Sequence, residues 1–372
     1  MPEKTYRVLG LLSGSSLDGT DLAVCSFSID PNLPSKILSW NIHFARTIPY
    51  PQAWIDRFRS LPSADARSLV LADTELGHYY GALIDRLLKE HSLTVDLIAS
   101  HGHTIFHFPE LKTTTQIGDG AAIVAETGID TVTQMRSLDV AFGGEGAPLA
   151  PLGDKYLYPG FTYYLNLGGI ANVTACLDGN IIAFDICPCN QILNALAELA
   201  GQPFDRDGAI AASGLLDRPL LGKFQQDDYL TRPFPKSLDN TWAQIHQVKD
   251  ALESEAGLED KMYTAVEFIA MEIARALIDL DQKDTLRPLT LYCTGGGALN
   301  HYLISRIRFH CEGIELILPS RKIIEFKEVS FIALAGLFRC LRIPSLFASV
   351  TGAPLDTING ALYSNSTSSP WS

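Results

Sequence analysis

The feature that most constrains the fold is a pattern that occurs twice: an apolar strand, a glycine-rich turn and a second apolar strand. Residues 8–12 and 22–27 form the first pair, and the segment between them reads SGSSLDGTD. Residues 161–167 and 170–177 form the second pair, which Gly168 and Gly169 join. Apolar runs bounded by turn residues are typical of buried strands in hairpins. Because each hairpin opens one half of the chain, the pattern predicts a duplicated fold.

Helical and strand patterns alternate through the rest of the chain. Further helices are expected over residues 66–91, over 260–279 and from Asn300, and further strands over 96–100 and 289–293. This alternation predicts a layered α/β fold.

The length of the chain predicts more than one domain. At 372 residues it exceeds the size at which a single core usually divides. We expect an N-terminal domain over residues 1–158, a C-terminal domain over 159–365 and a frayed polar tail over 366–372.

Composition excludes several classes of partner. Hydrophobic residues make up 47% of the chain, which is too many for a disordered protein. The formal net charge of −13 argues against nucleic acid, which needs a basic face. The first residues lack the pattern of a signal peptide, and no apolar run approaches the ~20 residues of a membrane helix. We therefore expect a cytoplasmic protein with no membrane partner.

The cysteines indicate reduced thiols rather than disulfides or zinc. There are seven, scattered and mostly within apolar runs. Cys187 and Cys189 form a C-x-C, but no second pair lies at zinc-finger spacing.

The first glycine-rich turn has the composition of an anion site. Glycines expose backbone N–H groups beside the hydroxyls of Ser15 and Ser16. Asp18 and Asp21 would repel a phosphate unless Mg²⁺ lay between them. A polar hairpin whose side chains satisfy their own backbone is the alternative.

Two further glycine turns strengthen the first interpretation. Gly168 and Gly169 follow one strand, and the run from Gly295 to Gly297 follows another and precedes a helix. The third turn would suit the base or ribose of a nucleotide. The Walker and dinucleotide-binding motifs are absent, so a nucleotide would be held in another way.

Ten motifs follow one another along nearly the whole chain: residues 10–21 (GLLSGSSLDGTD), 101–109 (HGHTIFHFP), 116–119 (QIGD), 139–151 (DVAFGGEGAPLAP), 166–174 (NLGGIANVT), 184–190 (FDICPCN), 205–208 (DRDG), 295–300 (GGGALN), 327–328 (KE) and 351–362 (TGAPLDTINGAL). In this order they resemble the motifs of the anhydro-N-acetylmuramic acid kinases, a family of the actin-like sugar-kinase superfamily.

The resemblance implies a fold and a reaction. The fold would be two actin-like, ribonuclease H-like α/β domains, each a mixed sheet flanked by helices, with a nucleotide cleft between them. The substrate would be a 1,6-anhydro amino sugar from cell-wall turnover. Water would open its ring while ATP, with Mg²⁺, donates the γ-phosphate, and the product would be N-acetylmuramic acid 6-phosphate. The family also suggests a homodimer.

The resemblance assigns roles to individual residues. Asp185 would be the base for water, Asp18 would hold Mg²⁺ directly or through water, and His101, Arg136, Asn190 and Glu328 would bind the sugar. The residues that would bind ATP are Gly14, Ser15, Ser16, Leu17, Asp18, Gly19, Thr20, Asp21, Gly168, Gly169, Gly295, Gly296, Gly297 and Asn300.

Other roles remain open for some of these side chains. Asp185 could instead cap the helix that starts near Asn190. Arg136 could bind the lactyl carboxylate of the sugar or pair with Asp139. Glu328 could orient the sugar or begin a helix with favourable charge.

Two segments of the resemblance have no single assignment from the residues. His101, His103 and His107 do not have the spacing of a metal motif, so His101 is expected to contact the sugar or to be structural. Residues 143–148 are expected to form a hinge or a sugar loop.

Three departures from the family pattern bear on the substrate. Gln134 stands where the family has an aspartate, and Cys187 and Cys189 stand where it has glycines. If those glycines admit a close approach of the sugar, two thiols would crowd it. A kinase for another amino sugar and a non-catalytic nucleotide-binding protein therefore remain alternatives.

Overall fold

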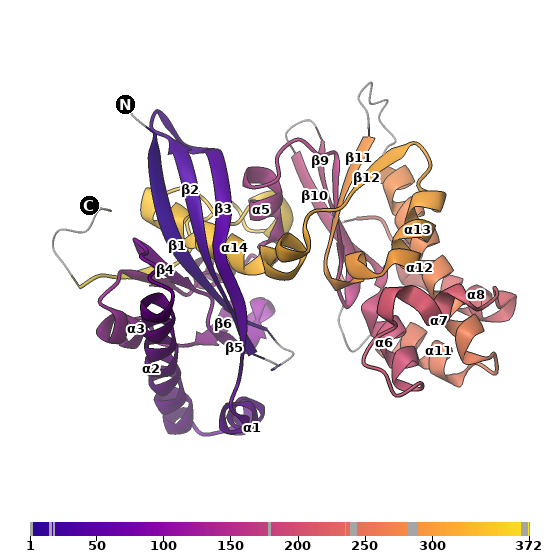
Figure 1. The fold of residues 1–372 in the computed structure, drawn as a ribbon, viewed down its shortest axis with the longest axis horizontal. Coiled ribbons are helices and arrows are strands. Elements are labelled where there is room, and N and C mark those ends of the chain that lie inside the picture. Colours follow the sequence, from indigo (N-terminus) through magenta and orange to yellow (C-terminus); the bar gives the residue numbers. More distant parts are fainter. Residues whose placement is uncertain are drawn as a thin grey trace. The chain divides into compact units, whose positions relative to one another are not determined.

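The computed structural model describes residues 3–14, 17, 19–177, 180–234, 236–238, 244–280, 289–365 and 371. The chain forms two compact units (Figure 1). Unit 1 comprises Met1–Pro159 and Phe326–Ser372, and unit 2 comprises Gly160–Glu325. No helix among the described residues is long and apolar enough to span a membrane.

Unit 1 contains one large sheet, a small hairpin and its covering helices. Its first segment comprises β1 (Lys4–Ser13), β2 (Gly19–Asp30), β3 (Leu33–Pro49), α1 (Gln52–Ser60), α2 (Ala66–Glu90), β4 (Leu97–Ser100), β5 (His103–Phe108), β6 (Thr113–Ile117), α3 (Gly120–Thr127), β7 (Thr131–Thr133), α4 (Ser137–Ala141) and α5 (Ala150–Tyr156). Its second segment comprises most of α14 (Arg321–Leu341), then α15 (Ala348–Thr351) and β13 (Ala361–Tyr363).

The large sheet has the order β13-β7-β4-β1-β2-β3. Strands β1, β2 and β3 are antiparallel, whereas β4 runs parallel to β1 and β7 runs parallel to β4. Strands β1 and β2 pair from Lys4 opposite Ile29 to Ser13 opposite Thr20, which confirms the first predicted hairpin.

The alternation of side chains along β1 explains its two apolar faces. Leu9 and Leu11 belong to the hydrophobic core that also contains Leu76 and Tyr80 of α2. Gly10 faces the other way, and a Cβ there would lie 2.3 Å from the Val329 carbonyl oxygen of α14. Helices α2 and α14 therefore cover opposite faces of this sheet, and a glycine in the first motif serves their packing.

Unit 2 repeats this arrangement with different helices. It comprises β8 (Tyr163–Leu167), β9 (Ile170–Leu177), β10 (Asn180–Pro188), α6 (Asn190–Glu198), α7 (Ala209–Ala212), α8 (Arg218–Gln225), α9 (Asp228–Thr231), α11 (Lys249–Glu253), α12 (Leu258–Leu280), β11 (Leu289–Thr294), α13 (His301–His310) and β12 (Ile314–Ile317). Its sheet has the order β10-β9-β8-β11-β12, with β8 to β10 antiparallel and β11 and β12 parallel to β8.

The two sheets share one topology, which confirms the predicted duplication. In each unit three antiparallel strands come first, and two parallel strands are then added beside the first strand. This is the ribonuclease H-like order of the actin-like fold, so the predicted fold class is confirmed.

The core of unit 2 lies between its sheet and α12. Thr264, Phe268 and Ile273 of this helix are buried, and Phe268 lies 5.0 Å from the ring of Phe224 on α8. Figure 1 shows α6, α7, α8 and α11 gathered at one end of α12. The helix predicted over residues 260–279 is therefore the central helix of this unit.

The end of the chain differs from the sequence-based expectation. Residues 159–365 were expected to form one C-terminal domain, but the part from Phe326 clusters with unit 1. The physical reason is that β13 completes the first sheet by pairing with β7, and α14 packs on β1. Of the tail predicted to be frayed, Trp371 is described, and its ring stacks on Tyr6 at 5.0 Å.

Candidate active site

Two of the predicted glycine turns meet in unit 2. Strands β8 and β11 are parallel neighbours, with Asn166 opposite Thr294, so their carboxyl ends lie side by side. The turns that follow them are Gly168–Gly169 and the run from Gly295 to Gly297. Both turns therefore lie at one edge of the sheet, where α/β folds place their ligands.

Glycine is required where these turns approach each other. Gly295 has a φ of +85°, and a Cβ there would lie 2.7 Å from the Leu167 carbonyl. At Gly297 a Cβ would lie 2.8 Å from the Leu167 Cβ. A Cβ on Gly296 would meet no atom closer than 3.7 Å, an ordinary van der Waals contact with Asn190, so the middle of this turn is not crowded.

Asn190 ties the turns to α6. Its Nδ2 donates to the Leu167 carbonyl across 3.0 Å, and its backbone N–H donates to the Gly168 carbonyl across 3.1 Å. The structure thus shows Asn190 in a structural role beside the glycine turns. Its predicted contact with the sugar stays a prediction.

Asn300 begins the helix that follows the third turn. Its Oδ1 accepts the Leu303 N–H of α13 across 3.0 Å, as an N-cap does. Gly208 of the DRDG motif, at a φ of +75°, packs so closely that a Cβ would lie 2.4 Å from this Oδ1. The motif glycine therefore supports the end of the third turn.

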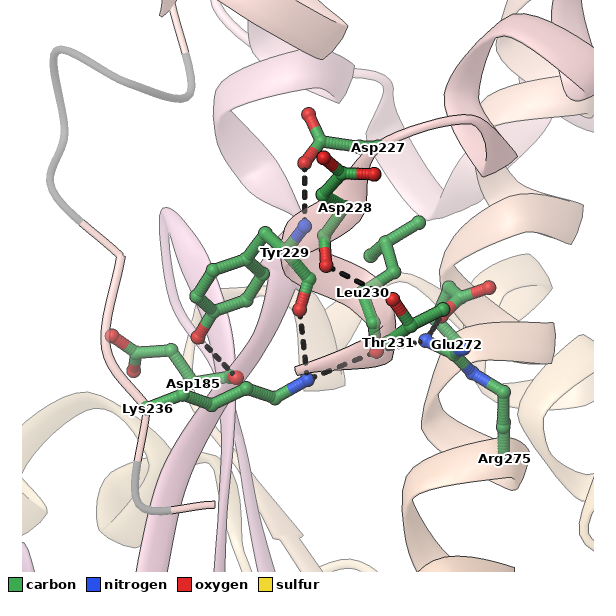
Figure 2. Close-up of polar contacts among 9 residues, drawn as sticks. All are labelled: Asp185, Asp227, Asp228, Tyr229, Leu230, Thr231, Lys236, Glu272 and Arg275. Atoms are coloured by element: carbon green, nitrogen blue, oxygen red, sulfur yellow. Dashed lines mark hydrogen bonds and ion pairs between the residues drawn. The ribbon is translucent and has the colours of Figure 1, made fainter. Parts of the chain in front are cut away.

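Asp185 lies near the end of β10, at the edge of the second sheet. Its Oδ2 accepts the Leu238 N–H across 2.8 Å, and its backbone carbonyl accepts the Tyr229 hydroxyl across 2.7 Å. Figure 2 shows the carboxylate beside the segment that carries Tyr229 and Lys236. The carboxylate does not bond to α6, whose N-cap residue is Cys189, so the helix-cap alternative is wrong.

Burial raises the pKa of the Asp185 carboxyl, and the Leu238 N–H opposes that rise by stabilising the charged form. A buried carboxylate with a raised pKa is a stronger base than a solvated one. These are the properties that the predicted role requires.

The two departures next to Asp185 do not place thiols at the surface. Cys187 and Cys189 are both 0% exposed and belong to the core of unit 2 with Ile192. Burial raises the pKa of the Cys189 thiol to about 12. The structure contradicts the expectation that these thiols crowd a ligand, because both fill the apolar interior.

The first glycine turn belongs to unit 1, and the structure describes part of it. Ser15, Ser16 and Asp18 lie outside the described residues. Gly14 is exposed, and Leu17 has a φ of +59°.

The residues that close this turn belong to the sheet. A Cβ on Gly19 would lie 2.5 Å from the Ile48 carbonyl oxygen of β3. Thr20 is 0% exposed and donates its hydroxyl to Leu12, and Asp21 accepts the Thr47 hydroxyl. Their predicted contacts with ATP stay predictions.

A buried polar cluster supports the base of this turn. Ser13 and His103 Nδ1 are hydrogen-bonded across 2.8 Å, and the hydroxyls of Tyr50 and Tyr80 across 2.6 Å. The ring of Phe58 stacks on His103. Burial lowers the pKa of His103 to about 4, so this imidazole is neutral at physiological pH.

The structure brings His101 and Arg136 together. Arg136 Nε donates to His101 Nε2 across 2.7 Å, and Arg136 Nη1 donates to the Gly146 carbonyl across 2.8 Å. Burial lowers the pKa of His101 to about 3, with a further contribution from the Arg136 charge. Burial also lowers the pKa of Arg136, to about 10, which leaves it charged at neutral pH.

The negative charge of Glu328 acts on Arg136. It raises the pKa of the guanidinium, whereas burial lowers it. Glu328 is exposed and lies inside α14. The alternative that Glu328 begins a helix is therefore wrong.

Asp139 is not the partner of Arg136. It is 0% exposed, and its Oδ1 accepts the hydroxyls of Thr351 and Thr357 across 3.0 and 3.1 Å. Its Oδ2 accepts the Gly146 N–H across 2.8 Å. This buried carboxylate fixes the loop over residues 143–148 to the segment after α14.

A small polar cavity of about 50 Å³ lies beside His101. The Ser100 hydroxyl and the Gln116 Oε1 are buried without a hydrogen-bond partner and belong to residues that line it. Gln134, with a φ of +56°, also lines it. The cavity can hold water, since its polar lining offers hydrogen bonds.

The described residues contain no group of three or more His, Cys, Asp or Glu side chains that could hold a metal ion. The three histidines at positions 101, 103 and 107 have different hydrogen-bond partners, which are Arg136, Ser13 and Thr114. Of the two aspartates considered for Mg²⁺, Asp21 bonds Thr47 within the sheet.

The topology of the two sheets defines a protein of the actin-like class. Residues 6–365 match the family model for anhydro-N-acetylmuramic acid kinase. The chain therefore belongs to the anhydro-N-acetylmuramic acid kinase family.

Curated relatives agree with this assignment. Proteins named anhydro-N-acetylmuramic acid kinase from Shewanella amazonensis and Gloeobacter violaceus are each 32% identical to it; they match 95% and 93% of this chain over 98% and 95% of their own lengths. Among solved structures, a hexokinase aligns with a TM-score of 0.45 at 11% identity over 90% of this chain and 85% of its own.

Several residues of the site were not identified from the sequence. Tyr229 and Lys236 lie in a segment without a recognised motif, and Asp139 was considered only as a partner of Arg136. The pairing of Ser13 with His103 joins residues 90 positions apart. No local pattern indicates such contacts.

Proposed function

We propose that this chain is an ATP-dependent kinase that opens the 1,6-anhydro ring of anhydro-N-acetylmuramic acid and releases N-acetylmuramic acid 6-phosphate and ADP. The observation that carries the proposal is the placement of Asp185 in a protein of this family. The carboxylate is largely buried at the end of β10, and its pKa is raised.

Asp185 would activate a water molecule. It takes a proton from water, and the water oxygen bonds to the first carbon of the sugar as the bond from that carbon to the sixth oxygen breaks. The sixth oxygen then bonds to the γ-phosphorus, and the phosphorus–oxygen bond to ADP breaks. Because the base must be ionised, the rate is expected to fall as the pH drops through the raised pKa of Asp185.

Unit 2 would bind the nucleotide through the backbone of its two glycine turns, Gly168–Gly169 and Gly295 to Gly297. A Cβ would collide at Gly295 and Gly297, whereas at Gly296 it would make only an ordinary contact. Unit 1 would bind phosphate at its first turn, through Gly14, Ser15 and Ser16. Mg²⁺, bound by Asp18 directly or through water, would neutralise phosphate charge there.

Unit 1 would also bind the sugar. Arg136 keeps its charge, and its Nε and Nη1 are held by His101 and Gly146. We infer that the guanidinium binds the lactyl carboxylate, because arginine binds carboxylates with two parallel hydrogen bonds. Glu328 would orient the sugar hydroxyls.

Further parts of the proposal concern the cell and the assembly. We propose that the enzyme works in the cytoplasm, in the recycling of peptidoglycan sugars, and that it forms a homodimer. Light scattering of the purified chain at micromolar concentration tests the dimer directly.

The reaction can be tested by ADP release from the purified chain with a panel of sugars. We expect release with anhydro-N-acetylmuramic acid and little with N-acetylmuramic acid. In ¹⁸O-water the product should gain one heavy oxygen at its first carbon. Release only with a sugar that has a free sixth hydroxyl, or ATP binding without release, would overturn the proposal.

The base can be tested with Asp185→Asn, which should lower kcat by at least about a hundredfold, as expected for loss of a general base. Asp217→Asn is the matched control. Asp217 caps α8 in the same unit, and asparagine caps a helix as well as aspartate. Full activity of Asp185→Asn would refute the assigned role.

A further inference from the structure

Residues 227–234 and 236–238 contain the partners of Asp185, which they contact in three ways. The Asp185 N–H donates to the Lys236 carbonyl across 3.2 Å. The Asp185 carbonyl accepts the Tyr229 hydroxyl across 2.7 Å, and Oδ2 accepts the Leu238 N–H across 2.8 Å. One segment therefore bonds the backbone donor, the backbone acceptor and the carboxylate of this residue.

The sheet alone leaves Asp185 poorly fixed. Strand β10 is an edge strand, and among the described residues β9 is the one strand that pairs with it within the sheet. The register of that pairing shifts between Asp185 and Cys187, which marks a β-bulge. Ladder bonds are disrupted at a bulge, so the direction of a side chain there depends on other contacts.

Lys236 fixes the conformation of the segment (Figure 2). Its Nζ donates to the carbonyls of Tyr229 and Leu230 across 3.2 and 3.1 Å. The same Nζ lies 4.8 Å from the centre of the Tyr229 ring. These contacts fold the segment back on itself, and Tyr229 is only 2% exposed.

Helix α12 anchors the segment to the core. Arg275 Nη2 donates to the Leu230 carbonyl across 2.6 Å and to the Glu272 carboxylate. Glu272 is buried, with an exposure of 5%. The rigid central helix is thus linked through Leu230 and Tyr229 to the peptide of Asp185.

We propose that Tyr229 is a positioning residue for the base Asp185, and that Lys236 and Arg275 hold Tyr229 in place through the carbonyls of α9. This inference rests on the proposed function, because it assigns Asp185 the role of base. Tyr229 acts through the Asp185 backbone and needs no contact with either substrate.

The hydroxyl affects both the direction and the charge of the carboxylate. Without it the Asp185 carbonyl loses its bond to Tyr229, although the Asp185 N–H keeps its bond to Lys236. The carboxylate would then move away from the position in which it accepts the proton of the water molecule. A small misplacement of a catalytic group costs up to about a hundredfold in rate. The Leu238 N–H would also donate a weaker hydrogen bond to the carboxylate, so the charged form of Asp185 would be less stabilised.

The test is Tyr229→Phe in the full-length chain, which removes one oxygen atom and keeps the ring. We expect kcat to fall about tenfold, with the KM for ATP and for the sugar within about twofold of wild type. We also expect the acidic limb of the pH profile of kcat to move to higher pH. A merely structural role would change the melting temperature and leave that limb in place.

Tyr6→Phe is the matched control, since Tyr6 lies near the start of β1 and stacks on Trp371. It should leave kcat and the pH profile unchanged. Lys236→Met is the second variant, and it should shift the acidic limb in the same direction. The double variant should lose less than the product of the two single losses, because both changes disrupt one set of contacts.

The outcomes separate this inference from the proposed function. If wild type releases ADP and Asp185→Asn does not, while Tyr229→Phe keeps the wild-type kcat and acidic limb, the positioning role is refuted. If wild type releases no ADP with any anhydro sugar, the proposed function fails, and with it the premise of the inference.

Discussion

Arg136 donates its Nε–H to Nε2 of His101 across 2.7 Å, and this bond determines the protonation of the imidazole. An arginine can only donate, so Nε2 must accept and carries no proton. The proton of the neutral ring is then on Nδ1, which lies 3.2 Å from the Gly102 carbonyl. We therefore expect His101 to orient the guanidinium rather than to transfer protons.

The first prediction concerns this acceptor. His101→Gln keeps an acceptor near the position of Nε2, whereas His101→Leu removes it. We expect the leucine variant to raise the KM for the anhydro sugar about tenfold, which corresponds to one lost charge-assisted hydrogen bond, and the glutamine variant to lie closer to wild type. Steady-state kinetics at pH 7.5 measures both. Equal KM values for the two variants would contradict an orienting role.

The second prediction concerns stability in acid. His101 and His103 are both buried, with pKa values of about 3 and about 4 in the folded chain against 6.5 for a free histidine. Between these values the unfolded chain binds more protons than the folded one, so the free energy of unfolding falls as the pH falls. By pH 5 the loss is about 2 kcal/mol for each histidine.

Urea denaturation at pH 7 and pH 5 measures this loss. The variant with His101→Gln and His103→Asn has neither titratable ring, so its loss over the same interval should be smaller by about 4 kcal/mol. An equal loss in wild type and variant would show that these rings are protonated in the folded chain.

The third prediction concerns the crowded turn of unit 2. Gly295→Ala adds a Cβ at a φ of +85°, 2.7 Å from the Leu167 carbonyl. Because backbone atoms must move, we expect a loss of about 1–3 kcal/mol in the free energy of unfolding and weaker ATP binding. Chemical denaturation and calorimetric titration with ATP measure the two effects.

Gly222→Ala is the control for this turn. Gly222 lies inside α8, and a Cβ there would meet no atom within 4 Å. Alanine should stabilise this helix by about 0.5–1 kcal/mol and leave ATP binding unchanged. If both variants bound ATP as wild type does, the third turn would not contribute to the nucleotide site.

Periodicity and turn chemistry were sufficient to predict the two hairpins and the long helices. Leu76 and Tyr80 recur at helical spacing within α2 and are buried as that spacing predicts. The strand β3 was missed, because it is mostly exposed and has no continuous apolar run such as the buried strands have. The return of residues 326–372 to unit 1 was also missed, since it depends on pairing between β7 and β13, far apart in sequence.

Some residues of the candidate site were predicted and others were missed, again because local patterns do not reveal contacts between residues far apart in sequence. Gly295 follows a strand in a recognisable glycine turn, and local sequence was enough to find it. Asp185 lies near the end of β10, and the resemblance to the family assigned its role. Tyr229 was not found, because its role depends on a hydrogen bond across 44 residues to a backbone carbonyl, which any residue at position 185 would offer. The orientation of Cys187 and Cys189 was also mistaken, since sequence alone does not show which side of a bulged strand faces the core.

The last prediction concerns these two cysteines. Because both thiols are 0% exposed and lie in the apolar core of unit 2, we expect them to fill space in the interior without contacting a ligand. Cys187→Ala and Cys189→Ala should each cost about 1–2 kcal/mol in unfolding free energy, as small cavities do, and leave the order of sugar preference unchanged. A thiol reagent should modify neither residue in the folded chain, since burial raises the pKa of Cys189 to about 12 and raises that of Cys187 well above its ordinary value. Mass spectrometry after brief labelling, with the chain unfolded in urea as the reference, checks the modification. A changed sugar preference in either alanine variant, at an unchanged stability, would show that the thiol faces the substrate.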